Sequence, residues 1–163
     1  MLNWQQILEE RLAVFGHRNW IVVADSAYPA HSLAGIETVP TNRNHWAVLE
    51  AVLAELTISK HVKPVVYTDQ ELQSVPETDA PGISEYRDKL ADLLKGVPVH
   101  QLPHDEIIAR LDEAGKTFRV LILKTDLTIP YTSVFMELDC GYWSSEAETR
   151  LREAMKKSGT AKP

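Results

Sequence analysis

The sequence predicts one α/β domain with a mainly parallel sheet flanked by helices, followed by a C-terminal helical extension. Short runs rich in Val, Ile and Leu alternate along the chain with segments whose apolar residues recur three and four positions apart. These short runs are continuously apolar, which is typical of strands covered on both faces in a parallel sheet. A length of 163 residues suits one ordinary domain. We place this domain at residues 1–143 and the extension with its tail at residues 144–163.

The boundaries of the predicted elements follow from capping residues, glycines and prolines. In the first helix, for example, Ile7, Leu8 and Leu12 share one face, and Gly16 follows as the stop. We expect strands at Trp20–Ala24, 62–68, 97–102, 118–123 and 133–138. Between them we expect a first helix capped by Asn3, a second capped within residues 41–44, a third at 84–95 and a fourth at 104–114 that Gly115 ends. A last, charged helix begins with the capping-box pair Ser145 and Glu148 and ends near Gly159. The last helix has a thin apolar stripe, so it could be an oligomer contact or a solvated tail.

The composition argues against several classes of function. The net charge is −6 and the basic residues are scattered, which disfavours a nucleic-acid partner. Cys140 is the only cysteine, so one chain can form neither a disulfide nor a cysteine-based zinc site, and a reducing compartment is expected. No apolar run approaches the roughly 20 residues that span a bilayer, and the first residues lack the pattern of a secretion signal. We therefore expect a cytoplasmic protein without a membrane or nucleic-acid partner.

Polar residues that suit carbohydrate chemistry follow the first predicted strand. Asp25 comes directly after the strand, with Ser26, Tyr28 and His31 close behind. Open α/β sheets bind ligands outside the carboxyl ends of their strands. A carboxylate there can accept hydrogen bonds from two sugar hydroxyls, and an imidazole can transfer a proton near neutral pH.

Each of these residues also has an ordinary structural interpretation. Asp25 could cap a loop, and His17, just after a helix end, could interact with the helix dipole. His31 could be structural, while His45 and His61 are expected on helix or loop surfaces. The residue pattern alone therefore leaves the function undecided.

A family resemblance favours one function. Residues 16–32, with the sequence GHRNWIVVADSAYPAHS, closely resemble the signature of the L-fucose mutarotase and D-ribose pyranase family. The element Pro29-Ala30-His31-Ser32 looks more like the fucose-type branch than the ribose-type branch. The order and the spacing of the pieces both match, and the resemblance extends to about residue 138.

The resemblance implies a role for particular residues. His17 takes the catalytic proton-transfer role, and Asp25 binds sugar hydroxyls. His104 and Tyr131 resemble the family's histidine and tyrosine that contact the substrate. The remaining implied site residues are Ser133 as a substrate-binding group and His31, Tyr28 and Asp126 as supporting groups.

Two of these positions depart from the family pattern. Ser133 stands where the family usually has asparagine, so a shorter hydroxyl replaces an amide that can both donate and accept. Asp126 is one position out of step with the acidic residue that usually precedes the tyrosine. Both changes affect the expected substrate.

The resemblance implies an isomerase of the racemase-and-epimerase type that interconverts anomers or ring forms of a free monosaccharide, fucose-like or ribose-like. It implies a homo-oligomer, such as a ring, and needs no metal or other cofactor, in agreement with the absence of glycine-rich nucleotide-binding motifs. One alternative is a non-catalytic monosaccharide-binding or regulatory protein of the same fold. Another is a metal-dependent hydrolase that uses His17, Asp25, His31 and His104.

Overall fold

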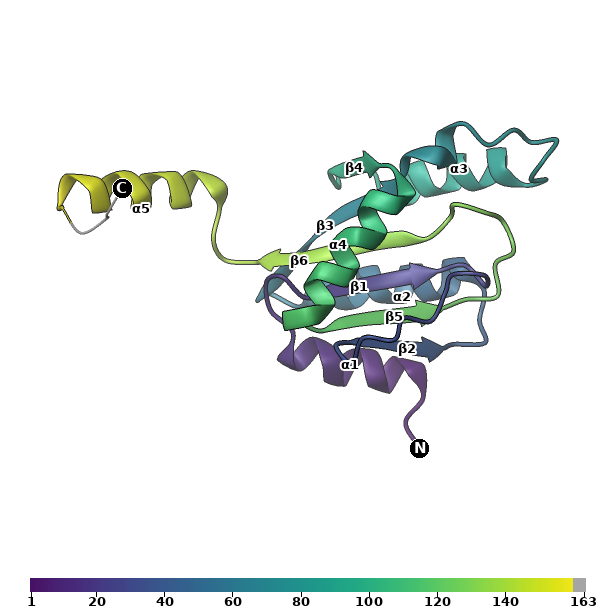
Figure 1. Ribbon diagram of the computed structural model, residues 1–163, viewed down its shortest axis with the longest axis horizontal. Helices are drawn as coiled ribbons and strands as arrows, with labels where there is room; N and C mark the ends of the chain where they lie inside the picture. Colours follow the sequence, from purple (N-terminus) through teal and green to yellow (C-terminus); the bar gives the residue numbers. More distant parts are fainter. Residues whose placement is uncertain (160–163) are drawn as a thin grey trace.

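A six-stranded mixed sheet is the centre of the fold within residues 1–159, the part of the chain that the computed structural model describes (Figure 1). The strands lie in the order β2-β5-β1-β6-β3-β4. All of them run in one direction except β6, which pairs antiparallel with both β1 and β3. Their bounds are β1 Trp20–Ala24, β2 Ile36–Pro40, β3 Val62–Asp69, β4 Val99–Leu102, β5 Val120–Lys124 and β6 Val134–Cys140. The predicted α/β class with a mainly parallel sheet is confirmed.

Helices cover both faces of this sheet. Three of them, α1, α2 and α3, pack on one face, where their buried residues form one hydrophobic core with Ile21 and Val23 of β1. Helix α4 packs on the other face against Trp20 and Val22. Neighbouring residues of β1 thus point into different cores, which explains why this strand is continuously apolar. The helices are α1 Trp4–Val14, α2 His45–Ile58, α3 Ile83–Leu93, α4 His104–Thr117 and α5 Ser145–Lys157, with a short 3-10 helix at Gln70–Gln73.

Several predicted helix ends are confirmed by the capping contacts. The Asn3 side chain accepts the backbone N–H of Gln6, whose own side chain bonds back to Asn3. Asn44 caps α2 by accepting the N–H of Ala47. The cap of α5 is one residue earlier than predicted, because Ser144 and not Ser145 accepts the N–H of Ala147.

The prediction missed β2 and placed the end of α4 too early at Gly115. The strand β2 lies at the edge of the sheet and is only partly buried, so its sequence shows no continuous apolar run. Gly115 lies inside α4, where an added Cβ would be 2.7 Å from Cγ1 of Ile36. A Cβ on Gly35 would in turn collide with the carbonyl oxygen of Gly115. The two glycines therefore allow close packing of the β2 entry against the helix, rather than a helix stop.

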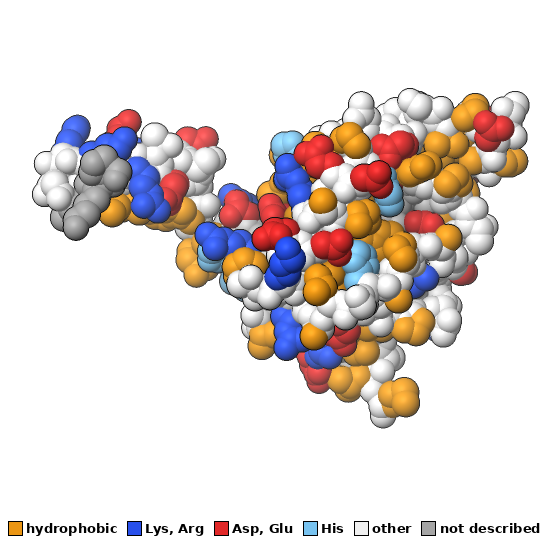
Figure 2. All heavy atoms as spheres, in the orientation of Figure 1, with side chains coloured by type: hydrophobic (Ala, Val, Ile, Leu, Met, Phe, Trp, Pro, Cys, Tyr) orange, Lys and Arg blue, Asp and Glu red, His pale blue; other side chains and the backbone are white. Residues whose placement is uncertain are grey.

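Helix α5 projects away from the rest of the chain (Figure 1). None of its described residues is buried, and Tyr142, Trp143 and Leu151 are exposed. Hydrophobic side chains lie along one side and at the base of this arm (Figure 2). The backbone carbonyl of Trp143 meets Nζ of Lys63 at 3.4 Å. Among residues 1–159, none of the helices has the length and apolar character needed to cross a membrane.

Removal of residues 144–163 tests whether α5 is a solvated tail. We expect the melting temperature to change by less than about 2 °C, because exposed surface residues contribute within about 0.5 kcal/mol and no described residue of α5 is buried. Calorimetry of the truncated and full chains measures this. The control is Ile107→Ala in the core under α4, which should lower the free energy of unfolding by about 2–5 kcal/mol. A fall of more than about 5 °C on truncation would instead show that α5 packs on another copy.

Candidate functional site

Acidic side chains collect at the edge of the sheet where β1 and β3 end and β6 begins. Val134, the first residue of β6, pairs with Val23 of β1 and with Thr68 of β3. Asp25 follows β1, and Asp69 is the last residue of β3. Because neighbouring strands are about 4.8 Å apart, the two carboxylate-bearing positions flank β6 at a separation of about 10 Å.

Asp25 is fixed by the start of β6. The Ser133 hydroxyl donates to Oδ1 of Asp25 at 2.7 Å and accepts the backbone N–H of Asp25 at 3.1 Å. Ser133 is buried, whereas Asp25 is partly exposed. Within residues 1–159, Oδ2 of Asp25 has no hydrogen-bond partner, so it is available to an external hydroxyl group.

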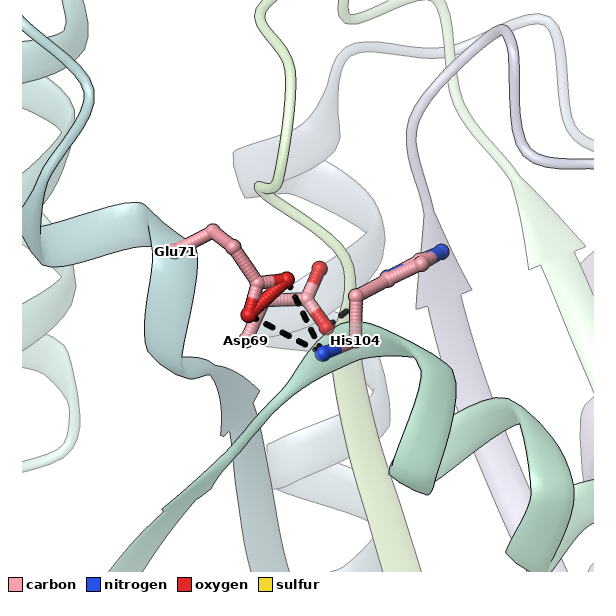
Figure 3. Close-up of side chains that lie close together, drawn as sticks. All are labelled: Asp69, Glu71 and His104. Atoms are coloured by element: carbon pink, nitrogen blue, oxygen red, sulfur yellow. Dashed lines mark hydrogen bonds and ion pairs between the residues drawn. The ribbon is translucent and has the colours of Figure 1, made fainter.

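His104 is held by two acidic residues of one segment, Asp69 at the end of β3 and Glu71 in the 3-10 helix that follows it (Figure 3). Oδ1 of Asp69 is 2.9 Å from Nδ1 of His104. Both carboxylate oxygens of Glu71 accept the backbone N–H of His104, at 2.9 and 3.0 Å. His104 is the first residue of α4, and its N-cap residue Pro103 has no side-chain hydrogen bond to offer. Glu71 therefore satisfies an N–H that the helix leaves unpaired.

The Asp69 carboxylate is completely buried. Burial is the main reason that its pKa is raised to about 6; His104 opposes this effect, and the charges of Glu71 and Asp25 add to it. Oδ2 of Asp69 has no partner in the described chain. A buried carboxylate oxygen without a partner is costly, so this atom is a natural acceptor for a ligand hydroxyl.

Three side chains, those of Asp69, Glu71 and His104, bring possible ligand atoms within 4.8 Å of one another, a spacing that a metal ion could bridge. However, Nδ1 of His104 and both oxygens of Glu71 are already engaged in hydrogen bonds. We therefore interpret the group as a hydrogen-bonded cluster.

Tyr131 lies next to His104. The two rings are nearly perpendicular, with centroids 5.6 Å apart. Tyr131 adopts a left-handed backbone conformation with φ of 59° and is 39% exposed. It borders an open hollow of about 540 Å³ that Glu71 also lines. Glu71 and Tyr131 therefore face a space large enough for a small ligand.

A second layer of buried groups supports the turn that carries Tyr131 and Ser133. The Tyr86 hydroxyl donates to the carbonyl oxygen of Thr132 at 2.6 Å and lies 3.0 Å from Nε2 of His45. Since the tyrosine proton goes to Thr132, Nε2–H of His45 is the donor in the other bond. His45 is buried, which corrects its predicted position on a surface, and Trp46 and Tyr86 enclose its ring. Burial lowers the pKa of His45 to about 4.

Tyr28 and His31 form a separate group on the α4 side of the sheet. The Tyr28 hydroxyl is 2.9 Å from Nε2 of His31, and Nδ1 of His31 is 2.9 Å from Oδ1 of Asp112 on α4. Tyr28 is buried against Phe135. These bonds hold the segment after Asp25 on α4, which is a supporting position.

His17 lies at the other end of β1. It is exposed in the turn between α1 and β1, whereas Asp25 follows the strand. At about 3.3 Å per residue, the intervening strand places the two residues roughly 20 Å apart. His17 therefore does not meet Asp25 within one chain, and the four residues of the metal-hydrolase alternative do not assemble either.

Asp126 also lies apart from the cluster. Its backbone N–H donates to the carbonyl oxygen of Arg43, and its exposed side chain makes no hydrogen bond or ion pair within the described residues. The structure thus brings together Asp25, Ser133, His104 and Tyr131 and leaves Asp126 outside.

Asp69 and Glu71 are the site residues that the sequence analysis missed. A signal for Asp69 was present, because it follows the apolar strand 62–68 just as Asp25 follows β1. Glu71 is placed by the 3-10 turn after β3, which has no clear sequence pattern.

Comparison with known proteins gives one family. The family model described as the RbsD / FucU transport protein family matches residues 4–140. No curated protein sequence matches the chain.

Solved structures share the fold. RbsD of Bacillus subtilis in complex with D-ribose is 23% identical, with a TM-score of 0.57, and the match covers 85% of this chain and 94% of that one. The fucose mutarotase of Streptococcus pneumoniae in complex with L-fucose is 17% identical, with a TM-score of 0.54 and coverage of 82% and 91%. FucU of Bifidobacterium longum is 15% identical, with a TM-score of 0.52 and coverage of 82% and 93%.

The buried His45 predicts a pH-dependent stability. The folded chain protonates His45 only near pH 4, whereas the unfolded chain does so near 6.5. The stability that neutral His45 contributes is therefore complete above pH 6.5 and is lost as the pH falls toward 4, by about 3 kcal/mol. The measurement is urea unfolding of the native chain and of His45→Gln at several pH values.

The quantity to compare is the difference in unfolding free energy between the two proteins. This difference removes the opposite effect of Asp69, whose raised pKa stabilises the fold as the pH falls through about 6. A difference that stays constant between about pH 7 and pH 4 would mean that His45 is not buried as a neutral group.

Proposed function

Because the chain belongs to the RbsD / FucU family, we propose that it interconverts anomers or ring forms of a free monosaccharide. The observation that carries this proposal is the cluster at the carboxyl edge of the sheet, where Asp25, Asp69 and His104 combine hydroxyl acceptors with an imidazole. Carboxylates suit the hydroxyl-rich surface of a sugar, and imidazole suits proton transfer. The protein would then be an isomerase.

The chemistry needs proton transfer and little else. Opening a sugar ring requires removal of the proton from the anomeric hydroxyl and delivery of a proton to the ring oxygen, and closing reverses both transfers. Oδ2 of Asp25 and Oδ2 of Asp69 have no partner within residues 1–159. We propose that they accept sugar hydroxyls and orient the ring, while Tyr131 closes one side of the pocket.

We propose that His17 reaches this pocket from a second copy of the chain. The family resemblance gives His17 the proton-transfer role, yet one chain holds it at the opposite end of β1 from Asp25. Its exposure leaves it accessible to a neighbouring copy. This arrangement makes the site a shared one and requires a homo-oligomer, for which a ring is one symmetric solution.

The substrate proposal is a fucose-like or ribose-like free sugar. Two of the solved structures of similar fold contain sugars, D-ribose in one and L-fucose in the other. In this chain both hydrogen bonds of the Ser133 hydroxyl go to Asp25. The asparagine that the family usually has here would offer an amide group to the sugar. We infer that the sugar is held by fewer side-chain donors at this point.

The same substitution favours a second candidate, a monosaccharide-binding protein of the same fold without turnover. In this alternative the pocket and its carboxylates remain, but the loss of the amide removes catalytic alignment. Exchange measurements separate the two candidates, because binding and turnover give different signals.

Magnetisation-exchange NMR on fucose, ribose and galactose tests the enzyme proposal. We expect the native protein to accelerate exchange between forms of at least one sugar, and His17→Ala to lower this acceleration by about 10² to 10⁴, the usual contribution of general acid–base catalysis. The control is His100→Ala, an exposed histidine on β4 outside the cluster, which should keep the native rate. Saturation transfer to a bound sugar without faster exchange would favour the binding protein instead.

Mixing two inactive variants tests the shared site. His17→Ala and Asp25→Asn each damage one half of the pocket, so a mixed oligomer contains some pockets with both native residues. Unfolding and refolding the variants together should restore about a quarter of the native activity, the random share of intact pockets in a symmetric assembly. Each variant refolded alone is the control, and no recovery in the mixture would contradict a pocket shared between two copies.

A further inference from the structure

We propose that Asp69 is a positioning residue that holds His104 with Nδ1 protonated, so that Nε2 takes the proton of the anomeric hydroxyl. This inference rests on the proposed function and assigns the group that works opposite His17. The family resemblance implies only that His104 contacts the substrate, and Asp69 is not among the residues that it implies.

Three contacts hold His104 in place, two to its imidazole ring and one to its backbone N–H. Oδ1 of Asp69 lies 2.9 Å from Nδ1 of His104, and a carboxylate in this position can only accept, so Nδ1 carries the hydrogen. Glu71 holds the backbone N–H at the start of α4. The Tyr131 ring packs edge-on against the imidazole. Rotation of the side chain is therefore opposed by its backbone anchor, its carboxylate and its aromatic neighbour.

Nε2 is left for the substrate. In Figure 3 the ring of His104 extends away from Glu71, and its outer nitrogen points away from both carboxylates. Among residues 1–159, Nε2 of His104 has no hydrogen-bond partner. With Nδ1 protonated, neutral Nε2 has a lone pair and can act as a base.

A second carboxylate–imidazole pair in the chain provides an internal comparison. Nδ1 of His31 is also 2.9 Å from a carboxylate oxygen, that of Asp112. However, Nε2 of His31 is occupied by the Tyr28 hydroxyl, and Asp112 is half exposed. The two pairs share one geometry, but only the pair with buried Asp69 leaves its outer nitrogen available.

The proton transfers balance without a further reactant. The anomeric O–H proton passes to Nε2 of His104, and its electron pair forms the carbonyl double bond. The bond from the anomeric carbon to the ring oxygen breaks, and the ring oxygen keeps that pair and takes a proton from His17 of the second copy. Ring closure reverses each transfer and restores both histidines.

Asp69 lowers the energy of the charged imidazolium that this step creates. The carboxylate is fully buried, where charge interactions are weakly screened. The other acidic groups that face it are Glu71 and Asp25. Since burial raises the pKa of Asp69 only to about 6, the side chain is ionised at neutral pH and can pair with the imidazolium.

The test compares Asp69→Asn with the matched variant Asp112→Asn. Each change removes one charge from a carboxylate–imidazole pair and keeps the size of the side chain. At saturating sugar we expect Asp69→Asn to slow anomer exchange by about 100-fold, within the range of acid–base catalysis. Asp112→Asn should stay within about twofold of the native rate, because Nε2 of His31 is not available to a substrate.

Nitrogen-15 NMR of the histidine rings gives a second readout that does not depend on activity. In the native protein His104 should show hydrogen on Nδ1 and a bare Nε2. Finding the hydrogen on Nε2 would overturn the proposal, even if Asp69→Asn failed to fold.

The possible failures are distinguishable. A native protein that accelerates exchange together with an equally fast Asp69→Asn variant overturns the role of Asp69 and leaves the proposed function intact. A native protein that accelerates exchange for no sugar overturns the proposed function. The proposed role of Asp69 and His104 in catalysis is then overturned too.

Discussion

The insertion of β6 between β1 and β3 is the constraint on which the candidate site depends. Because β6 runs against its neighbours, its first residue lies at the edge where β1 and β3 end. This direction places Ser133 beside Asp25 and Tyr131 beside His104. A parallel strand in the same position would begin at the opposite edge, so Ser133 and Tyr131 would lie away from Asp25 and His104.

Much of the fold could be predicted from local patterns, because the buried strands carry continuous apolar runs and the helices carry caps. Asn3 and Asn44 are examples, since each accepts a backbone N–H three residues ahead. The edge strand β2 escaped prediction because Glu37 and Thr38 interrupt its apolar character. Gly115 was misread because its packing partner, Ile36, lies far away in the sequence. Long-range packing of this kind leaves no local signal.

The position of Asp25 in the candidate site could be predicted, because the family resemblance and the end of a strand coincide there. The predicted strand Trp20–Ala24 already separates His17 from Asp25, whereas the family resemblance assigns both residues to one site. Burial was also hidden: His45 looks like a surface residue in its helix, yet the ring is enclosed by neighbouring aromatic residues. Asp69 was recognisable only by applying to β3 the reasoning used for β1.

The order of the strands has a consequence for how the chain is made. The group β2-β5-β1 and the group β3-β4 share no strand pairing of their own in the described sheet, and β6 joins them. Of the strands in the described sheet, β6 is the last to be synthesised. A nascent chain can therefore assemble two half-sheets, each with one acidic residue of the candidate site, but the distance between these residues is set only when residues 134–140 have emerged. The candidate site is accordingly assembled after most of the chain has been synthesised, and a fragment that ends before β6 keeps Asp25 and Asp69 without the strand that aligns them.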